Sequence, residues 1–421
     1  MKGSVLAALL AAASTAVASA QQAPRPLTLA EAEELLVERS LPVAAGRYVV
    51  EGNEAARRIA GYRPNPTLQV MADQVPFTSN VPRSVPRFFS TNSDAGANPV
   101  YSVQYEQLLE RGNKRALRQL QAEAVTDASR AQVLDTIRQQ LLALRQSFTT
   151  ALLARTNLRL AEDTDSQYAE TEKIMEIRHR SGDVAAVDLD RIKAARLSYR
   201  QAILDARTAY WQACRDVQSV LNLAAPVEAT GALQHRPVQS GLADLQRTAV
   251  DERPDLAAAR RSEIAAGHGT RLAEAQRTRD VTVAMNLQRV GNDHAVGATA
   301  SVPLFLFNNN RDAVRQATAQ QRLANVQVRQ AETAVLTEVE KAHHALHAAQ
   351  QSLDLYNRDA VERTARIREV ILYSYQRGEA SILEVLEAQR NANQIQTAFN
   401  QSMAAYEAAY WQLEFAVGGK L

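Results

Sequence analysis

The chain has 421 residues, enough for two or three ordinary domains, and its 48 basic and 46 acidic side chains give a formal net charge of +2. Basic and acidic residues are interspersed, so no basic footprint for nucleic acid is present. The single cysteine, Cys214, excludes an internal disulfide framework, and its helical surroundings predict a packed small apolar side chain.

Residues 1–20 are typical of a signal peptide. Lys2 precedes an apolar run, and Ala18-Ser19-Ala20 is a small-x-small cleavage signal, so we expect cleavage after Ala20. The alternative, a membrane anchor, is disfavoured because the apolar run is short for a bilayer span. Charged or amide residues interrupt every later apolar run. We therefore expect a periplasmic protein, a secreted protein or a strand-built outer-membrane protein.

The mature chain is predicted to begin with a structural repeat over residues 21–225. Alternating apolar and polar residues predict a β-hairpin over 66–108, interrupted by a surface loop at 76–99 that is rich in proline, serine and asparagine. A proline-free stretch with a coiled-coil-like apolar spacing then predicts a helical hairpin over 113–223. Its first arm would be about 100 Å long at 1.5 Å per residue, and its turn would lie at Gly182.

A linker over 226–240 and a second repeat over 241–421 follow. The second repeat predicts a β-hairpin over 280–305 and a helical hairpin over 310–417 with its turn at Gly378. The acidic residues after the two turn glycines, Asp183 and Glu379, are expected at the N-terminal ends of new helices. The alternative is that each glycine is an ordinary helix C-cap with no further role.

The two halves share one plan, which indicates an old duplication. The matched segments are 39–47 with 252–260 (RSLPVAAGR and ERPDLAAAR), 113–119 with 310–316, 179–183 with 375–379, and 209–212 with 409–412.

Four strands per chain are too few to close a barrel across a membrane, for which about eight is the practical minimum. If these strands enter lipid, several chains must share one barrel, because open edges would leave backbone groups unpaired in hydrocarbon. Two chains would give eight strands, and three would give twelve with room for a lumen. The alternative is a soluble hairpin packed on helices. Four amides would face the wet interior: Gln69, Gln104, Asn286 and Gln288.

The sequence resembles the outer-membrane efflux protein family, the TolC-like trimeric channels. The duplicated plan and residues 377–390, RGEASILEVLEAQR, carry this resemblance over nearly all of the mature chain. Residues 105–115, YEQLLERGNKR, and 303–310, PLFLFNNN, resemble the heavy-metal cation efflux branch. Many relatives carry a lipidated cysteine that this chain lacks, so barrel insertion is the expected anchor.

The resemblance implies a mainly α fold with a small β part. Long antiparallel helical hairpins and four transmembrane strands per chain would assemble as a homotrimer with a twelve-stranded barrel in the outer membrane and a twelve-helix periplasmic tunnel. The implied function is the outer-membrane channel of a tripartite efflux system, which exports small molecules or heavy-metal cations. The implied partners are a periplasmic adaptor, an inner-membrane RND-type pump and lipid. Alternatives are a type I protein-secretion duct and a soluble periplasmic adaptor or scaffold.

Carried over from the family, Glu384 and Glu387 would form two carboxylate rings at a periplasmic gate. Their repeat equivalents are Asp188 and Arg191, and an Arg191–Glu387 or Arg377–Asp188 pair could hold neighbouring hairpins shut. The alternative for both glutamates is an ordinary first-turn acid that complements a helix N-terminus. The residues expected to dock the adaptor are Arg180, Ser181, Gly182, Asp183, Arg377, Gly378, Glu379 and Ala380.

The sequence carries no phosphate-binding glycine loop, serine-nucleophile elbow or zinc-protease motif, so we expect neither an enzyme nor a cofactor. His343, His344 and His347 lack a fitting acid or cysteine, so we interpret them as solvated or lumen-facing and not as metal ligands. Trp211 and Trp411 are repeat equivalents, and we predict core packing for both.

Overall fold

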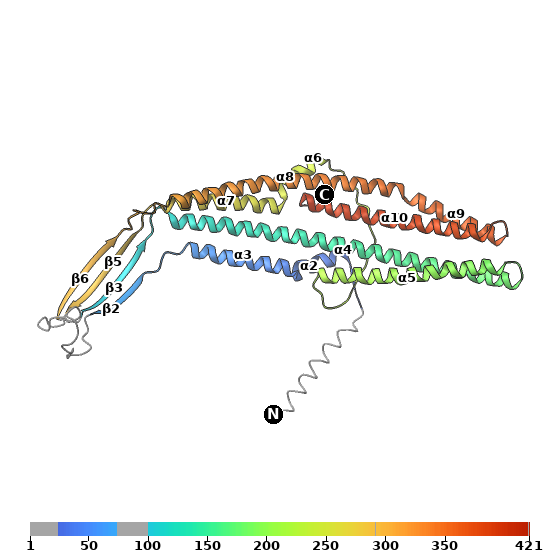
Figure 1. The fold of residues 1–421 in the computed structure, drawn as a ribbon, viewed down its shortest axis with the longest axis horizontal. Coiled ribbons are helices and arrows are strands. Elements are labelled where there is room, and N and C mark those ends of the chain that lie inside the picture. Colours follow the sequence, from blue (N-terminus) through green and yellow to red (C-terminus); the bar gives the residue numbers. More distant parts are fainter. Residues whose placement is uncertain (1–23, 74–99, 291, 420) are drawn as a thin grey trace, which may run out of the picture. The chain divides into compact units, whose positions relative to one another are not determined.

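The computed structural model describes residues 24–73, 100–290, 292–419 and 421. The predicted signal peptide (1–20) and the predicted loop (76–99) lie outside them. The chain is mainly helical with a smaller sheet component (Figure 1), which confirms the coarse fold class. Two compact units divide it: unit 1 comprises 1–48, 131–257 and 330–421, and unit 2 comprises 49–130 and 258–329. Each unit takes residues from both sequence repeats.

Unit 2 contains a four-stranded antiparallel sheet in the order β2-β3-β5-β6 (Figure 1). Its strands are β2 (Thr67–Asp73), β3 (Val100–Leu109), β5 (Val281–Val290) and β6 (Asp293–Ser301). The two hairpins, one from each repeat, are joined through β3 and β5, whose register pairs Val103 with Leu287. Sequence alternation predicted the strands but not this pairing, because nothing local in the sequence selects the partner of a hairpin edge.

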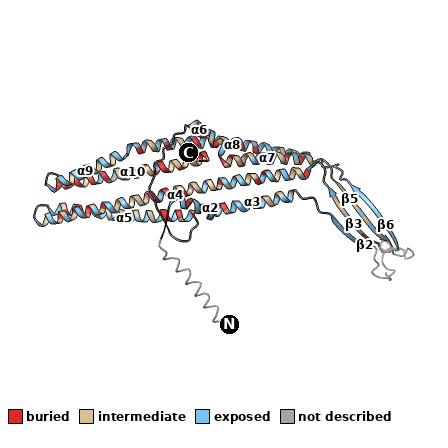
Figure 2. Cartoon of the chain, turned by 180° about the vertical axis from the view of Figure 1, so that it is seen from behind, coloured by how far each residue is buried: buried red, intermediate tan, exposed pale blue. Residues whose placement is uncertain are grey.

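The register of the sheet places apolar side chains on one face across all four strands. Val70 lies opposite Val103, and Leu287 lies opposite Val296. Most of the larger members of this face are exposed, among them Leu68, Val70, Tyr101, Val103, Tyr105, Met285, Leu287 and Val296. Figure 2 shows the exposed colour along the strands. Because successive side chains alternate between faces, the polar residues Gln69, Gln104, Asn286 and Gln288 share the opposite face.

The helices contain most of the described residues. They are α2 (Leu29–Arg39), α3 (Leu41–Ala60), α4 (Lys114–Arg180), α5 (Ala186–Val220), α6 (Leu242–Glu252), α7 (Pro254–Ala275), α8 (Arg311–Leu355), α9 (Arg358–Gln376) and α10 (Ile382–Val417). The longest, α4, has 67 residues. Among the described residues, none of the helices combines the length and hydrophobicity needed to cross a membrane.

The first arm of the second helical hairpin is not one rod, as we treated it, but two helices, α8 and α9. The break falls at Tyr356 and Asn357. The Asn357 side chain accepts a hydrogen bond of 2.9 Å from the Ala360 backbone N–H, which caps α9. Asparagine is among the preferred N-cap residues, so the signal was in the sequence.

The duplication is visible where strand gives way to helix. Asn113 and Asn310, matched in the sequence, both adopt left-handed backbone conformations (φ 58° and 62°) directly before α4 and α8. Each backbone carbonyl accepts the first intrahelical hydrogen bond, from Leu117 and Val314 respectively, both at 3.1 Å. Asparagine tolerates this conformation better than most residues, which explains its place at both junctions.

The core of unit 1 includes two short strands that the alternation pattern did not predict. β1 (Arg25–Leu27) pairs in parallel with β4 (Val227–Ala229), inside the segment predicted as a linker. Leu27 is fully buried in this cluster with Leu144, Phe148 and Leu221. Three-residue strands are too short to produce a periodic signal.

The prediction of buried tryptophans is correct for one of the pair. Trp411 is 6% exposed, and the guanidinium carbons of Arg145 and Arg236 each lie 4.3 Å from its ring centroid. Trp211 is 59% exposed and contacts only one guanidinium, that of Arg215, at 5.0 Å. The repeat match alone could not separate the two positions. Cys214 is buried, as predicted.

A buried arginine holds three helices of unit 1 together. Arg253 is 4% exposed, pairs with Asp255 and Glu338 at 2.6 Å each, and donates to the Ala416 carbonyl at 2.9 Å. Burial alone would raise the pKa of Asp255, but the hydrogen bonds and charge of Arg253 outweigh it and lower that pKa.

We predict that Arg253→Met lowers the free energy of unfolding by about 3 kcal/mol, because two partly buried carboxylates lose their cation. The matched control is Arg247→Met, since Arg247 forms an exposed pair with Asp244 at 3.1 Å and should contribute below about 1 kcal/mol. The measurement is chemical denaturation of the purified protein. Because the pKa of Asp255 is lowered, its contribution is complete above the unfolded value and is lost as pH falls through the folded one. Equal effects of the two substitutions would contradict the assignment.

Candidate functional site at the helical hairpin tips

The two turns of the helical hairpins are built alike. Gly182 and Gly378 have φ values of +84° and +82°. After each glycine, the next backbone N–H bonds back across the turn: Asp183 donates to Arg178 and Glu379 donates to Ser374, both at 2.9 Å. This is the Schellman pattern of a helix C-terminus, so the C-cap interpretation holds for both glycines. A Cβ at either glycine would meet nothing within 4 Å, so space around both turns is open.

The new helices begin later than predicted. Asp183 and Glu379 lie in the turns, whereas α5 begins at Ala186 and α10 at Ile382. The N-cap of α5 is Ala185, which makes no side-chain cap hydrogen bond. The acidic residues therefore belong to the turns and not to the new helices, because the backbone N–H groups of Asp183 and Glu379 are bonded back to the preceding helices.

The N-terminus of α10 has a capping box formed by Ser381 and Glu384. The Ser381 backbone N–H donates to the Glu384 carboxylate at 2.6 Å, and the Glu384 backbone N–H donates to the Ser381 hydroxyl at 3.3 Å. The backbone hydrogen bond, followed by the hydroxyl contact, lowers the pKa of Glu384. Glu384 is exposed, so its carboxylate stabilises the first turn while remaining in contact with solvent.

The two hairpins pack against each other just behind their tips. The buried cluster comprises Met175, Leu189, Ile192, Tyr375, Ile382 and Val385. The Arg178 guanidinium donates to the Tyr375 carbonyl at 3.0 Å and lies 5.4 Å from the centroid of its ring. Arg178 and Tyr375 were not singled out from the sequence, because nothing local marks a contact between residues 197 positions apart.

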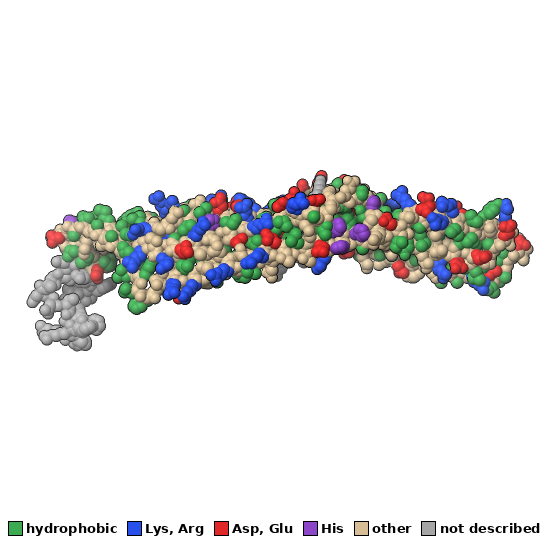
Figure 3. Space-filling model, turned by 90° about the horizontal axis from the view of Figure 1, so that it is seen from above, with side chains coloured by type: hydrophobic (Ala, Val, Ile, Leu, Met, Phe, Trp, Pro, Cys, Tyr) green, Lys and Arg blue, Asp and Glu red, His purple; other side chains and the backbone are tan. Residues whose placement is uncertain are grey.

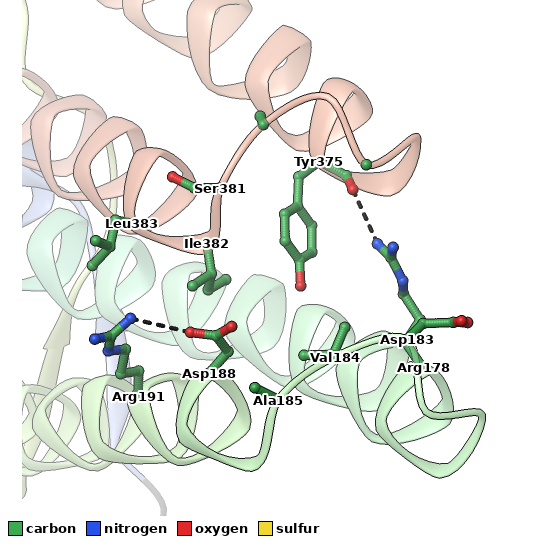
Figure 4. Close-up of a pocket in the computed structure, with 12 residues that line it drawn as sticks. Arg178, Asp183, Val184, Ala185, Asp188, Arg191, Tyr375, Ser381, Ile382 and Leu383 are labelled. Atoms are coloured by element: carbon green, nitrogen blue, oxygen red, sulfur yellow. Dashed lines mark hydrogen bonds and ion pairs between the residues drawn. The ribbon is translucent and has the colours of Figure 1, made fainter.

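A pocket of about 410 Å³ opens between the tips (Figure 4). The Tyr375 ring points into the space between the hairpins, and its hydroxyl is buried without a hydrogen-bond partner in the described structure. Burial raises the pKa of this hydroxyl, while the nearby Arg178 acts against the shift. Val184 and Ile382 supply apolar walls, so the pocket is a mixed surface and not a charged cleft.

The four predicted gate residues lie at the N-terminal ends of α5 and α10: Asp188 and Glu384 are in the first turns, and Arg191 and Glu387 are in the second turns. Arg191 pairs with Asp188 on its own helix at 3.1 Å. Within the described chain, neither the Arg191–Glu387 pair nor the Arg377–Asp188 pair forms. The Arg377 guanidinium instead lies 4.4 Å from the centroid of the Tyr373 ring. Pairing between subunits and the carboxylate rings of Glu384 and Glu387 stay predictions.

The predicted docking residues gather at the two tips and are exposed, except Ala380, which is half-buried. These are Arg180, Ser181, Gly182 and Asp183 on the first tip and Arg377, Gly378, Glu379 and Ala380 on the second. Large exposed apolar side chains, which were not predicted from the sequence, lie beside them. These are Ile177, Val187, Tyr373 and Leu383. The sequence signal for these side chains is that they are apolar residues outside the apolar stripe along which each helix packs.

A polar seam joins α4 to α9 and α10 behind the tips. Gln389 and Arg368 both donate to the Gln167 side-chain oxygen, at 2.9 and 3.0 Å. Farther along, Asn400 donates to Asn157 at 3.2 Å. Amide contacts tolerate small changes in donor and acceptor position better than a close-packed apolar interface does. The two hairpins are therefore joined along this seam by side-chain hydrogen bonds.

The described residues contain no group of three or more His, Cys, Asp or Glu side chains that could hold a metal ion. His343 and His347 line a pocket with His235, whose Nε2 lies 2.8 Å from the Gln350 side-chain oxygen. On the face drawn in Figure 3, basic and acidic side chains are interspersed over the helices.

Residues 245–419 match the family model described as "Outer membrane efflux protein". A search of curated proteins gives no match. Three solved structures are similar over 93% of this chain. They are VceC from Vibrio cholerae (TM-score 0.72, 18% identity, 96% of that chain), a membrane protein from Pseudomonas aeruginosa (0.77, 16%, 90%) and the open MtrE channel of Neisseria gonorrhoeae (0.73, 15%, 89%).

The chain therefore has the fold of outer-membrane channel proteins. The second part of the chain therefore matches the outer-membrane efflux protein family, and 93% of the chain shares the fold of these solved structures. Members of this family are channels and not enzymes, which agrees with the expectation from the sequence.

We predict that Ser381→Ala destabilises the first turn of α10 by about 1 kcal/mol, because the hydroxyl no longer accepts the Glu384 backbone N–H. Glu384→Gln should keep the capping box, since glutamine can also fill this position. Hydrogen exchange of the first-turn amides measures both. The lowered pKa of Glu384 means that its cap contribution is present above the unfolded value and is lost as pH falls through the folded one, whereas the glutamine variant should show no such loss. Fast exchange in both variants at neutral pH would contradict this role.

Proposed function

We propose that this protein is the outer-membrane exit duct of a tripartite efflux system. It acts as a homotrimer whose strands share one twelve-stranded barrel and whose helices form a periplasmic tunnel. The observation that carries the proposal is the apolar face of the β2-β3-β5-β6 sheet, on which large side chains are exposed on all four strands. Contiguous exposed apolar surface of this kind marks a contact with lipid or with another protein.

The opposite face of the same sheet supports a water-filled lumen. Gln69 and Gln104 are paired across β2 and β3, and Gln104 is paired with Asn286 across β3 and β5. Alternation of an apolar outer face with a polar inner face is the pattern of transmembrane barrels. A soluble adaptor would have no use for an exposed apolar sheet face, so this observation favours the duct.

The edges of the sheet require further copies of the chain. Among the described strands, β2 and β6 each have a partner on one side only. Unpaired backbone groups in hydrocarbon cost several kcal/mol each, so β2 of one chain should pair with β6 of the next. Three chains give twelve strands and leave room for a lumen, whereas two give eight and a filled interior.

The hairpin tips are the proposed docking surface for the periplasmic adaptor, through which the duct receives substrate from an inner-membrane RND-type pump. Both tips carry a glycine with open space around it, and the exposed apolar side chains Val187 and Leu383 lie nearby. A helical partner can therefore approach the turn backbone closely and still bury apolar surface.

The proposed gate lies just behind these tips. In the trimer, Glu384 and Glu387 would contribute three carboxylates each to rings that attract cations and repel one another. An opening movement would rearrange the polar seam of Gln167 and Gln389, whereas the Asp188–Arg191 pair lies within α5 and would move with that helix. A single exposed ion pair contributes less than about 1 kcal/mol to the stability of the closed state. Three symmetry-related copies together would contribute more.

For the substrate we propose small molecules or heavy-metal cations, the latter on the resemblance of residues 105–115 and 303–310 to the metal branch. The pump and adaptor largely choose the cargo. Comparing a deletion strain's sensitivity to metal cations and drugs, and its export of protein toxins, separates metal efflux, drug efflux and type I secretion.

Two neighbouring positions on β6 test the duct directly. Ala298 belongs to the apolar face, opposite Met285, and Thr299 belongs to the polar face, opposite Ala284. We expect Ala298→Lys to reduce insertion, because a lysine near the bilayer midplane costs about 2–4 kcal/mol. Thr299→Lys should insert normally and lower the cation preference of the channel. The measurements are the amount of protein in outer-membrane fractions and the reversal potential in planar bilayers under a salt gradient.

Equal insertion of the two lysine variants would contradict the claim that the apolar face of the sheet contacts lipid. A chain that stays in buffer and never conducts would favour the soluble scaffold.

The tip glycines can be tested separately for their cap and docking roles. Gly378→Ala strains the left-handed backbone, at about 1–2 kcal/mol, whereas Gly378→Asn is compatible with that backbone but places a side chain in the open space. If the tip docks a partner, efflux should be lost in both variants while the trimer persists in each. Gly52→Ala in α3, also with open space around it, is the control and should leave efflux unchanged. Normal efflux by the asparagine variant would show that Gly378 is only a cap.

A further inference from the structure

The strand–helix junction of unit 2 carries exposed apolar side chains and arginines that a water-filled duct does not by itself require. All four strands of the sheet have one end here, since Leu109 is paired with Val281 and Thr282 with Ser301, and β2 begins at Thr67. If the sheet crosses the outer membrane, this end marks the periplasmic boundary of the hydrocarbon. The inference below therefore rests on the proposed function.

An apolar segment directly follows β6 at this junction. Leu304 and Leu306 are 67% and 76% exposed, and Phe307 is fully exposed. The Leu306 backbone N–H donates to the Leu304 carbonyl at 3.0 Å, so the segment folds back on itself as a tight turn. The Phe305 ring lies 5.6 Å from the guanidinium carbon of Arg279. Side chains this apolar and this exposed mark a surface that is covered in the working protein.

Arginines surround the same junction, and the two acidic residues next to the strands are already in ion pairs. The carboxylate of Glu110, directly after β3, accepts a hydrogen bond of 2.9 Å from the Arg118 guanidinium. Asp280, directly before β5, is occupied by Lys114 at 2.8 Å and by the Arg111 backbone N–H at 2.8 Å. Six exposed arginines at the junction have no ion pair within the described structure: Arg63, Arg111, Arg115, Arg277, Arg279 and Arg311.

Two of these arginines line one pocket. Arg63 and Arg115 border a space of about 420 Å³ together with the aliphatic side chains of Pro64, Leu108 and Leu109. A cationic rim beside an apolar wall fits a group with an anionic head and a hydrocarbon body. The acidic residue that lines this pocket is Glu110, whose charge is already neutralised by Arg118.

The order of side chains along the strands agrees with a bilayer boundary. β5 carries no charged residue from Val281 to Gln288, and β6 carries charge only at its other end, in Asp293 and the titratable His294. Beyond the junction end come the aromatic and leucine segment and the arginines. Aromatic residues at the headgroup level and basic residues beside it are the arrangement by which membrane proteins hold the interface.

We propose that this junction is a binding site for the headgroups of anionic phospholipids in the periplasmic leaflet of the outer membrane. Arg63 and Arg115 bind the phosphodiester, and Leu304 to Phe307 insert among the headgroups and upper acyl chains. The site fixes the depth of the sheet in the bilayer at the point where strand gives way to helix.

Lipid preference of the full chain tests the arginines. The protein is reconstituted in nanodiscs of phosphatidylglycerol and phosphatidylcholine, and retained lipids are counted by native mass spectrometry. The preference for phosphatidylglycerol should fall about fivefold for each arginine removed in Arg63→Gln/Arg115→Gln. Arg261→Gln/Arg322→Gln removes two exposed arginines farther along α7 and α8 and should leave the preference unchanged. Equal preference in both double variants would overturn the site.

Insertion depth supplies a second measurement that does not depend on the arginine variants. In a Cys214→Ala background, Phe307→Cys and Val296→Cys are labelled with a fluorophore and quenched by nitroxides on the lipid headgroup or deep in the acyl chain. The headgroup nitroxide should quench the label at Phe307, and the deep nitroxide should quench the label at Val296. Val326→Cys, on an exposed position of α8, should be quenched by neither.

The outcomes separate the two proposals. If the Val296 label is quenched and the Phe307 label is not, another copy of the chain covers the segment, and the lipid site is wrong while the duct stands. If neither label is quenched, the sheet does not enter lipid, and both the duct and the lipid site are wrong.

Discussion

The organising constraint of this protein is a sheet that cannot be satisfied by one chain in water. Register pairs Val70 with Val103 and Leu287 with Val296, so apolar side chains form one continuous exposed face. The two outer strands within the described sheet also lack a second partner. Hydrocarbon against the face and further copies of the chain at the edges would meet both needs, and the proposed trimeric duct rests on that pair of requirements.

The helical part repeats one design and then departs from it. Both hairpin tips use a left-handed glycine and the same return hydrogen bond. Of these two new helices, α10 has a capping box, formed by Ser381 and Glu384, whereas α5 has Ala185 as its N-cap, without a side-chain hydrogen bond. The second tip is therefore the more firmly defined turn. The two hairpins therefore share the turn at the glycine and differ in how the following helix is capped.

Sequence periodicity was enough to predict both β-ribbons, the long helices and the tip glycines, because each leaves a local pattern. It could not predict contacts made across the chain, such as Arg178 with Tyr375, the pairing of β3 with β5, or the exposure of Trp211. The break at Asn357 has a local signal, a capping asparagine, but no proline or glycine marks it. The gate assignment of Glu384 came from resemblance alone, and its local geometry is that of a helix cap.

The most direct test of the central claim is disulfide cross-linking between the two edge strands in membranes. In a Cys214→Ala background, Gln69→Cys on β2 is combined in turn with Ala295→Cys, Gly297→Cys or Thr299→Cys on β6, all on the polar face of the sheet. The account predicts that at least one combination yields dimers and trimers, and nothing larger, on non-reducing gels. A chain that remains monomeric in every combination, in membranes and in detergent alike, would contradict it.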